Sequence, residues 1–217
     1  MLVLIHGFGT QIEQWKFRKP LDEKRGFLAF SEDIEQGKAV VFTWGIQQEF
    51  DFVEVINPLT FLDVYKKEKE MSESKKMLNE LTNFLETYQP DTVVCHSMGA
   101  FLLWNVVDSG NLPPCVKTVI LVQADVQTNR ELPQHEKAVI EDGNRKWYNI
   151  YCQWDNALLS SFAVNQALPT GLVGAQNKYI TNIFYALEKG PNFHEEILKQ
   201  EKFRDLVYRL RNNERID

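Results

Sequence analysis

Cysteine is scarce in this chain of 217 residues, which contains only Cys95, Cys115 and Cys152. Three scattered cysteines are too few for a disulfide framework. They also lack the short spacing of paired metal ligands, so we expect no metal site. The sequence therefore predicts three reduced thiols with structural roles.

Long apolar runs are missing as well. The first one, Leu2–Ile5, has four residues and no basic residues lead into it. A signal peptide needs a longer apolar region after a basic start, and a membrane-spanning helix needs about 20 apolar residues. We therefore expect a cytoplasmic protein without a membrane span.

Stretches of basic residues are also absent. The chain has 24 Lys and Arg against 30 Asp and Glu, a net charge of −6, and its densest charge, at 66–70 and 209–217, is mixed in sign. A phosphate backbone needs a continuous basic surface, so nucleic acid is not an expected partner. No glycine-rich nucleotide motif occurs, and His194-Glu195-Glu196 lacks the second histidine of a metalloprotease helix. The sequence thus implies no cofactor.

Short apolar runs do recur along the chain, and amphipathic stretches separate them without internal repeats. This alternation predicts a single α/β domain over 1–217, with a mostly parallel central sheet of about six strands and helices on both faces. A chain of this length buries roughly 70% of its unfolded surface, enough for a full core. The expected strands are 2–5, 39–43, 92–95, 118–122, 147–152 and 179–184.

Helical spacing is clearest between the second and third expected strands. Ser72 or Ser74 can cap the start of this helix, and Pro90 follows its end. Further helices are expected at 100–107 and 195–210, packed on the sheet. The apolar positions that define the first helix are Met77, Leu78, Leu81, Phe84, Leu85 and Tyr88.

A serine follows the third expected strand directly, in the sequence Cys95-His96-Ser97-Met98-Gly99. A nucleophile elbow turns so tightly from strand into helix that it needs small residues two positions before and after the serine. Gly99 meets this requirement, and Cys95 stands where the pattern G-x-S-x-G has its first glycine. The pattern indicates a nucleophilic Ser97, with a packed, protonated Cys95 beneath it. The alternative is a serine that caps the following helix.

The stretch His6-Gly7-Phe8-Gly9 follows the first expected strand. Together with the serine motif, it resembles the H-G-x-G oxyanion loop of the α/β-hydrolase superfamily. The resemblance implies the compact α/β-hydrolase fold, with the backbone N–H groups of Phe8 and Met98 forming an oxyanion hole. It also implies that His6 holds the loop by hydrogen bonds, while Gly7 and Gly9 let the backbone come close. The alternative is an ordinary glycine turn.

Two aspartates compete for the role of the acid. In α/β-hydrolases the chain order is nucleophile, acid, base, and the acid follows a later strand. Asp155 comes three residues after the expected strand 147–152, and Asp125 comes three residues after the expected strand 118–122. We favour Asp155, because Asp155-Asn156-Ala157-Leu158 resembles the D-x-A-L stretch that carries the acid in small, uncharacterised bacterial α/β hydrolases. Ala124-Asp125-Val126 resembles a second stretch of the same group. The other aspartate is expected to cap a loop by accepting backbone N–H groups.

The chain has four histidines, and elimination identifies a base. His6 belongs to the glycine loop, and His96 adjoins Ser97 with its side chain expected to point away. His135 lies in a polar, helix-like stretch and should face solvent. His194 follows the last expected strand and a turn-rich loop, which is the position of the base in this fold.

Ser97, Asp155 and His194 predict a serine hydrolase that cleaves a carboxylic ester through an acyl-enzyme on Ser97. The substrate would be a small ester-type molecule, with thioesters, amides and lactones left open. The alternative is a catalytically silent, hydrolase-like protein that binds a ligand or partner. The sequence leaves the oligomeric state open.

Two segments, 45–72 and 156–190, could form a lid or a wall over Ser97. The first contains Phe50, Phe52, Phe61 and Tyr65, which indicate an apolar acyl pocket. These aromatic residues could equally complete the core beneath long connections.

Overall fold

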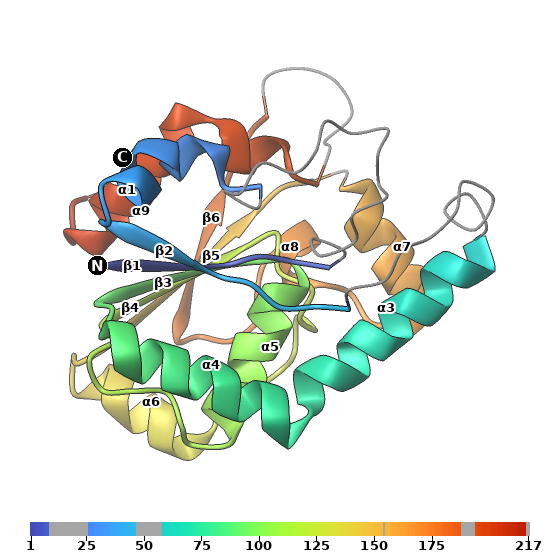
Figure 1. Cartoon of the computed structure of the whole chain (residues 1–217), viewed down its shortest axis with the longest axis horizontal. Coiled ribbons are helices and arrows are strands. Elements are labelled where there is room, and N and C mark those ends of the chain that lie inside the picture. The colour runs from blue at the N-terminus through green and yellow to red at the C-terminus, as the bar shows by residue number, and fades with distance from the viewer. Residues whose placement is uncertain (9–25, 47–57, 154, 188–193, 216–217) are drawn as a thin grey trace.

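The computed structural model describes residues 1–8, 26–46, 58–153, 155–187 and 194–215 (Figure 1). Its centre is a six-stranded sheet in the order β2-β1-β3-β4-β5-β6. Every neighbouring pair is parallel, which confirms the expected sheet. The strands are β1 (Leu2–Ile5), β2 (Ala39–Phe42), β3 (Thr92–His96), β4 (Thr118–Val122), β5 (Lys146–Tyr151) and β6 (Ile180–Phe184).

Helices cover both faces of the sheet. Figure 1 shows α1 and α9 on one side of the strands and α4 and α6 on the other. Alternate residues of β1 divide between two cores, Val3 and Ile5 in one and Leu2 and Leu4 in the other, because successive side chains of a strand point to opposite faces. One face carries α4 (Lys75–Tyr88), α5 (Met98–Asp108) and α6 (Gln134–Glu141), and the other carries η1 (Leu28–Phe30), α1 (Ser31–Glu35), η2 (Glu196–Lys199) and α9 (Glu201–Arg211).

Two expected helices differ in their ends. Ser74, not Ser72, caps α4, since its Oγ accepts the backbone N–H of Met77 at 3.3 Å. The helix expected at 195–210 is interrupted at Gln200, whose extended backbone separates η2 from α9. The carbonyl of Gln200 accepts the N–H of Phe203, so the interruption also starts the second helix.

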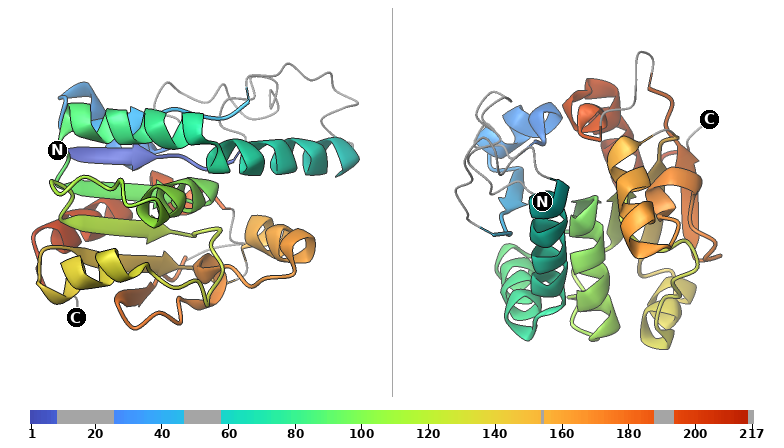
Figure 2. Two further views of the ribbon diagram at one scale, coloured as in Figure 1. Left: turned by 90° about the horizontal axis from the view of Figure 1, so that it is seen from below. Right: turned by 90° about the vertical axis from the view of Figure 1, so that its right-hand side faces the viewer.

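Besides α1, the sequence analysis did not assign α3 (Pro58–Glu73), α7 (Asn156–Asn165) and α8 (Thr170–Val173). Figure 2 shows α7 and one end of α3 extending beyond the carboxyl ends of the strands. Parallel strands gather their following loops at that edge, where ligands bind in open α/β sheets. Both segments expected as a lid or wall thus contain helices at this edge, although 47–57 and 188–190 lie outside the described residues.

The described part of the chain contains no helix that is both long and apolar enough to cross a bilayer.

Candidate active site

Ser97 lies in a sharp turn between β3 and α5. Its backbone has φ 52° and ψ −124°, a conformation that residues other than glycine rarely adopt. Hydrogen bonds to the next strand hold it there, because Ser97 N–H donates to the carbonyl of Val122 at 3.0 Å and its own carbonyl accepts the N–H of Asp125 at 3.1 Å. Ser97 occupies the N-cap position of α5 but makes no side-chain capping bond. The geometry is that of a strained strand-to-helix turn, a kind of strain that gathers at functional sites.

Two glycines bring the end of β1 against this turn. A Cβ atom on Gly7 would lie 2.6 Å from the Cβ of Ser97, and one on Gly99 would lie 2.4 Å from the carbonyl oxygen of His6. Either contact is too short for a larger residue, so these positions depend on glycine. Gly9, the other predicted loop glycine, lies outside the described residues.

His6 is buried and is hydrogen-bonded on both of its ring nitrogens at the start of the glycine loop. Its Nε2 accepts the backbone N–H of Trp44 at 3.0 Å, while Trp44 Nε1–H donates to the His6 carbonyl at 2.9 Å. With Nε2 an acceptor, the neutral ring carries its proton on Nδ1, 2.9 Å from the carbonyl of Gly7. The sequence analysis did not identify Trp44, because nothing in the chain order links it to His6.

The two predicted oxyanion donors are the backbone N–H groups of Met98 and Phe8. Met98 is the first residue of α5, where the helix dipole favours negative charge. Phe8 follows Gly7, and its ring meets the edge of the Tyr65 ring at 5.7 Å between centroids. Their role as a donor pair stays a prediction.

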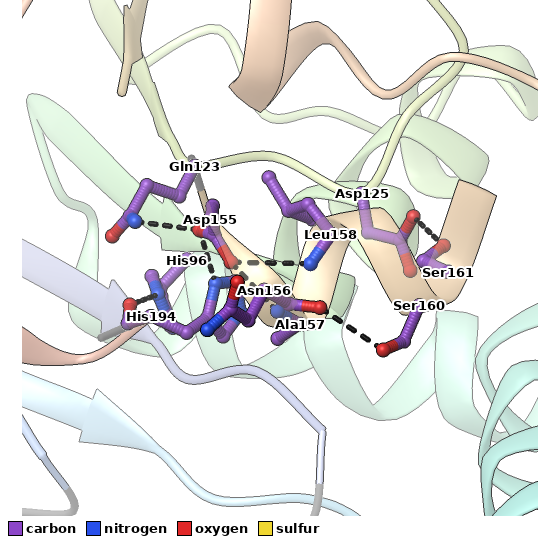
Figure 3. Close-up of polar contacts among 10 residues, drawn as sticks. All are labelled: His96, Gln123, Asp125, Asp155, Asn156, Ala157, Leu158, Ser160, Ser161 and His194. Atoms are coloured by element: carbon purple, nitrogen blue, oxygen red, sulfur yellow. Dashed lines mark hydrogen bonds and ion pairs between the residues drawn. The ribbon is translucent and has the colours of Figure 1, made fainter. Parts of the chain in front are cut away.

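Asp155 and His194 come together across 39 residues of sequence (Figure 3). His194 Nδ1 lies 2.6 Å from Asp155 Oδ2, and the Asp155 side chain is fully buried. The same oxygen accepts Gln123 Nε2–H at 2.6 Å. The other oxygen, Oδ1, accepts the backbone N–H groups of Ala157 and Leu158 at 3.0 and 3.1 Å. Four donors thus converge on one carboxylate and hold it in one orientation.

Asp125 points elsewhere. Its Oδ2 accepts the hydroxyl of Tyr65 at 2.8 Å, and its Oδ1 accepts that of Ser161 at 2.5 Å. Burial, together with the charge of Asp125, raises the pKa of Tyr65. The partners of Asp125 are thus two side-chain hydroxyls, whereas the backbone N–H groups that start α7 are accepted by Asp155, which also contacts His194. One carboxylate serves both purposes because the turn after β5 leads directly into α7.

His96 lies against His194. The sequence analysis compared the four histidines only by their positions in the chain and did not predict this contact. The Nε2 atom of His96 is 2.8 Å from the carbonyl oxygen of His194, and the two ring centroids are 4.4 Å apart. Burial, followed by the nearby charge of His194, keeps the pKa of His96 well below its ordinary value. His135, by contrast, is exposed as expected, with Nε2 2.9 Å from the carbonyl of Val107.

Gln123 is the other residue that sequence reasoning missed. It follows β4, is fully buried, and has a positive φ of 43°. A glutamine after a strand is an ordinary feature of a sequence, so only the fold reveals its contact with Asp155.

The cysteines are free thiols, as expected. Burial raises the pKa of Cys95 well above its ordinary value, and burial with the nearby Asp155 raises that of Cys152 to about 12. Cys95 is therefore a protonated, packed thiol beneath the Ser97 turn. Within the described residues, no cluster of His, Cys, Asp or Glu side chains could hold a metal ion.

A small cavity of about 30 Å³ lies beside Met98. Both candidate wall segments reach it, and Lys69 Nζ of α3 donates to Asn165 Oδ1 of α7 at 2.6 Å. Its lining is mixed in polarity rather than apolar, and the volume holds about one water molecule. The lining residues are Tyr65, Lys69, Met98, Phe101, Asp125, Val126, Gln127, Asn165, Ala167 and Pro169.

The parallel sheet, the strained serine turn and the glycine loop packed against it define the class of α/β hydrolases. A family model described as "Alpha/beta hydrolase of unknown function (DUF900)" matches residues 1–182, and the chain belongs to this family. The match includes Ser97 and Asp155 and ends before His194.

Among solved structures, the chain is similar to MenH from S. aureus, with 10% sequence identity, coverage of 98% of this chain and 92% of that chain, and a TM-score of 0.43. No curated protein sequence matches it.

Proposed function

We propose that this α/β hydrolase is a serine hydrolase that cleaves a carboxylic ester through an acyl-enzyme on Ser97. The observation that carries the proposal is the contact between His194 Nδ1 and Asp155 Oδ2, which are 2.6 Å apart. Asp155 follows β5 and Ser97 follows β3, so both lie at the carboxyl ends of the parallel strands. A serine hydroxyl is a weak nucleophile until a base takes its proton, and an imidazole needs a carboxylate to fix its tautomer. Asp155 occupies Nδ1 of His194, so Nε2 is the nitrogen left for the serine.

In the proposed first step, Ser97 Oγ attacks the carbonyl carbon of the ester while His194 Nε2 takes the hydroxyl proton. The carbonyl oxygen becomes an oxyanion, for which the N–H groups of Phe8 and Met98 are the proposed donors. The tetrahedral intermediate then collapses. The bond to the leaving oxygen breaks, and His194 returns the proton to the departing alcohol.

In the second step, water attacks the acyl carbon and gives one proton to His194. Collapse of the second intermediate breaks the bond to Ser97 Oγ, which recovers a proton from His194, and the carboxylic acid leaves. Asp155 stays ionised throughout and stabilises the imidazolium formed in both steps.

The substrate is proposed to be a small ester, with thioester, amide and lactone chemistry open to the same residues. The cavity of about 30 Å³ beside Met98 is too small for an acyl group, so it does not select the acyl chain.

A fluorophosphonate probe tests the proposal without knowledge of the substrate, since it phosphonylates only an activated serine. We expect the wild-type protein to be labelled and Ser97→Ala to be unlabelled with an unchanged melting temperature. Ser160→Ala is the matched control, because Ser160 lies exposed on α7 and donates only to the carbonyl of Asn156. It should be labelled like the wild type.

A folded wild-type protein that resists the probe and hydrolyses no ester would refute the proposal. It would favour instead the catalytically silent scaffold. If labelling succeeds, a panel of p-nitrophenyl esters with increasing acyl length, with and without a polar substituent, identifies the preferred acyl group.

A further inference from the structure

We propose that His96 is a positioning residue that fixes the main chain of His194 beside Ser97. The inference rests on the proposed function, in which His194 is the base. It adds a second point of attachment for that base, at its backbone carbonyl rather than at its side chain. The contact that suggests it is the 2.8 Å separation between His96 Nε2 and the carbonyl oxygen of His194.

The chemistry of this contact assigns the proton. A carbonyl oxygen can only accept, so Nε2 of His96 must donate. Burial keeps the pKa of His96 low, and the ring is therefore neutral with its proton on Nε2. A neutral His96 ring also avoids charge repulsion, because the His194 ring, 4.4 Å away, becomes positively charged when it takes the serine proton.

The two attachments of His194 act on different parts of the residue. Asp155 binds the side chain through Nδ1, and His96 binds the backbone through the carbonyl. With both hydrogen bonds in place, the His194 ring can neither rotate nor move with its backbone. Its Nε2 atom therefore keeps its orientation toward Ser97. A displacement of about 1 Å at such a site can cost on the order of 100-fold in rate.

The position of His96 in the chain makes the arrangement effective. His96 ends β3 and immediately precedes Ser97, so the strand that sets the serine also sets the anchor for the base. Space around the anchor is limited, since a Cβ on Gly7 would lie 3.2 Å from His96 Nδ1. The end of β3 therefore positions both the proposed nucleophile and the proposed base.

A matched pair of substitutions separates the hydrogen bond from the packing. Glutamine places its amide nitrogen near the position of the histidine Nε2, whereas asparagine places its amide nitrogen near that of Nδ1. His96→Gln can therefore still donate to the His194 carbonyl, and His96→Asn cannot. Both residues are uncharged amides, so the cost of burying polarity is similar.

The first readout is the rate of fluorophosphonate labelling at Ser97, with the melting temperature measured on each variant. We expect His96→Asn to slow labelling about 10- to 100-fold. His96→Gln should be labelled at least about five-fold faster than His96→Asn. Equal rates for His96→Asn and the wild type, or an equal loss in both variants that follows their melting temperatures, would overturn the inference.

The second readout needs no turnover. A proton held between His194 Nδ1 and Asp155 gives a far-downfield proton NMR signal, and we expect it in the wild type and in His96→Gln but weakened by exchange in His96→Asn. A signal that is the same in all three proteins would contradict the positioning role. If position 96 controls the signal but the wild type resists the probe, the proposed hydrolase function fails while the positioning inference stands.

Discussion

Replacing Asp155 by asparagine is the sharpest test of the proposed acid. All four groups that contact its carboxylate are N–H donors, from Gln123, His194 and the backbone of Ala157 and Leu158. An asparagine has one acceptor oxygen and one NH₂ group. Whichever way it is oriented, its NH₂ faces two groups that also donate.

The less costly orientation keeps the asparagine oxygen on the two backbone N–H groups and points its NH₂ at His194. The histidine can then only accept at Nδ1, which moves its own proton to Nε2, the atom that must accept from Ser97. Loss of the correct tautomer elsewhere costs about 10⁴-fold in kcat, and we expect about 10²- to 10⁴-fold here. This range corresponds to about 3 to 5.5 kcal/mol of transition-state stabilisation, with KM little changed.

Asp125→Asn is the matched control, because its carboxylate accepts from two hydroxyl groups. The hydroxyls of Tyr65 and Ser161 can rotate and accept from an amide, so no donor is left facing a donor. Activity of this variant should stay within about three-fold of the wild type, and any loss should follow its stability. Steady-state hydrolysis of the best p-nitrophenyl ester, together with thermal melting, measures both quantities.

The reasoning would be refuted if Asp155→Asn kept near-wild-type kcat in a folded protein. If Asp125→Asn were instead the crippled variant, the acid would have to be reassigned to Asp125, while the assignment of Ser97 would be unaffected.

Two further outcomes are expected. Gly7→Ala should abolish probe labelling with a measurable drop in melting temperature, because its Cβ would lie 2.6 Å from that of Ser97; unchanged labelling would contradict the packing of the loop on the serine turn. At the opposite edge of the sheet, burial tends to raise the pKa of Asp33, but hydrogen bonds from Arg204 and Tyr208 outweigh it and lower the pKa below the ordinary 3.8. Because the pKa of Asp33 is lower in the folded state than in the unfolded state, its ionised carboxylate stabilises the fold at pH values above the unfolded-state pKa. This stability is lost as the pH falls through the folded-state pKa. The free energy of unfolding in urea should therefore depend less on pH, below about pH 4, for Asp33→Asn than for the wild type.

The strands were predictable because each is a short apolar run between polar segments, and burial on both faces requires such runs in a parallel sheet. Their ends moved by a residue or so, as with β3, which extends through His96. The helix α3 was harder to assign, since the charged stretch 66–70 reads as a solvated surface and its helical periodicity is weak. The sequence pattern predicts a helix only when enough of its residues are apolar and lie on one buried face.

The candidate site divides in the same way. Ser97 and His6 sit in local motifs, and chain order suffices to nominate Asp155 and His194. The contacts of Gln123 with Asp155 and of His96 with His194 join residues 32 and 98 positions apart. No local pattern encodes such pairs, because they depend on which strands become neighbours in the sheet.

The strand order also has a consequence for synthesis of the chain. Among the strands of the described residues, β1 precedes the others in the chain, yet it lies between β2 and β3 and must wait for β3 before its second edge is covered. Ser97 is made soon afterwards, but Asp155 follows β5 and His194 comes only after β6. Long-range pairings of this kind form late and slowly. A growing chain would therefore carry Ser97 well before its proposed partners Asp155 and His194, and onset of the proposed hydrolysis during refolding would mark completion of the sheet.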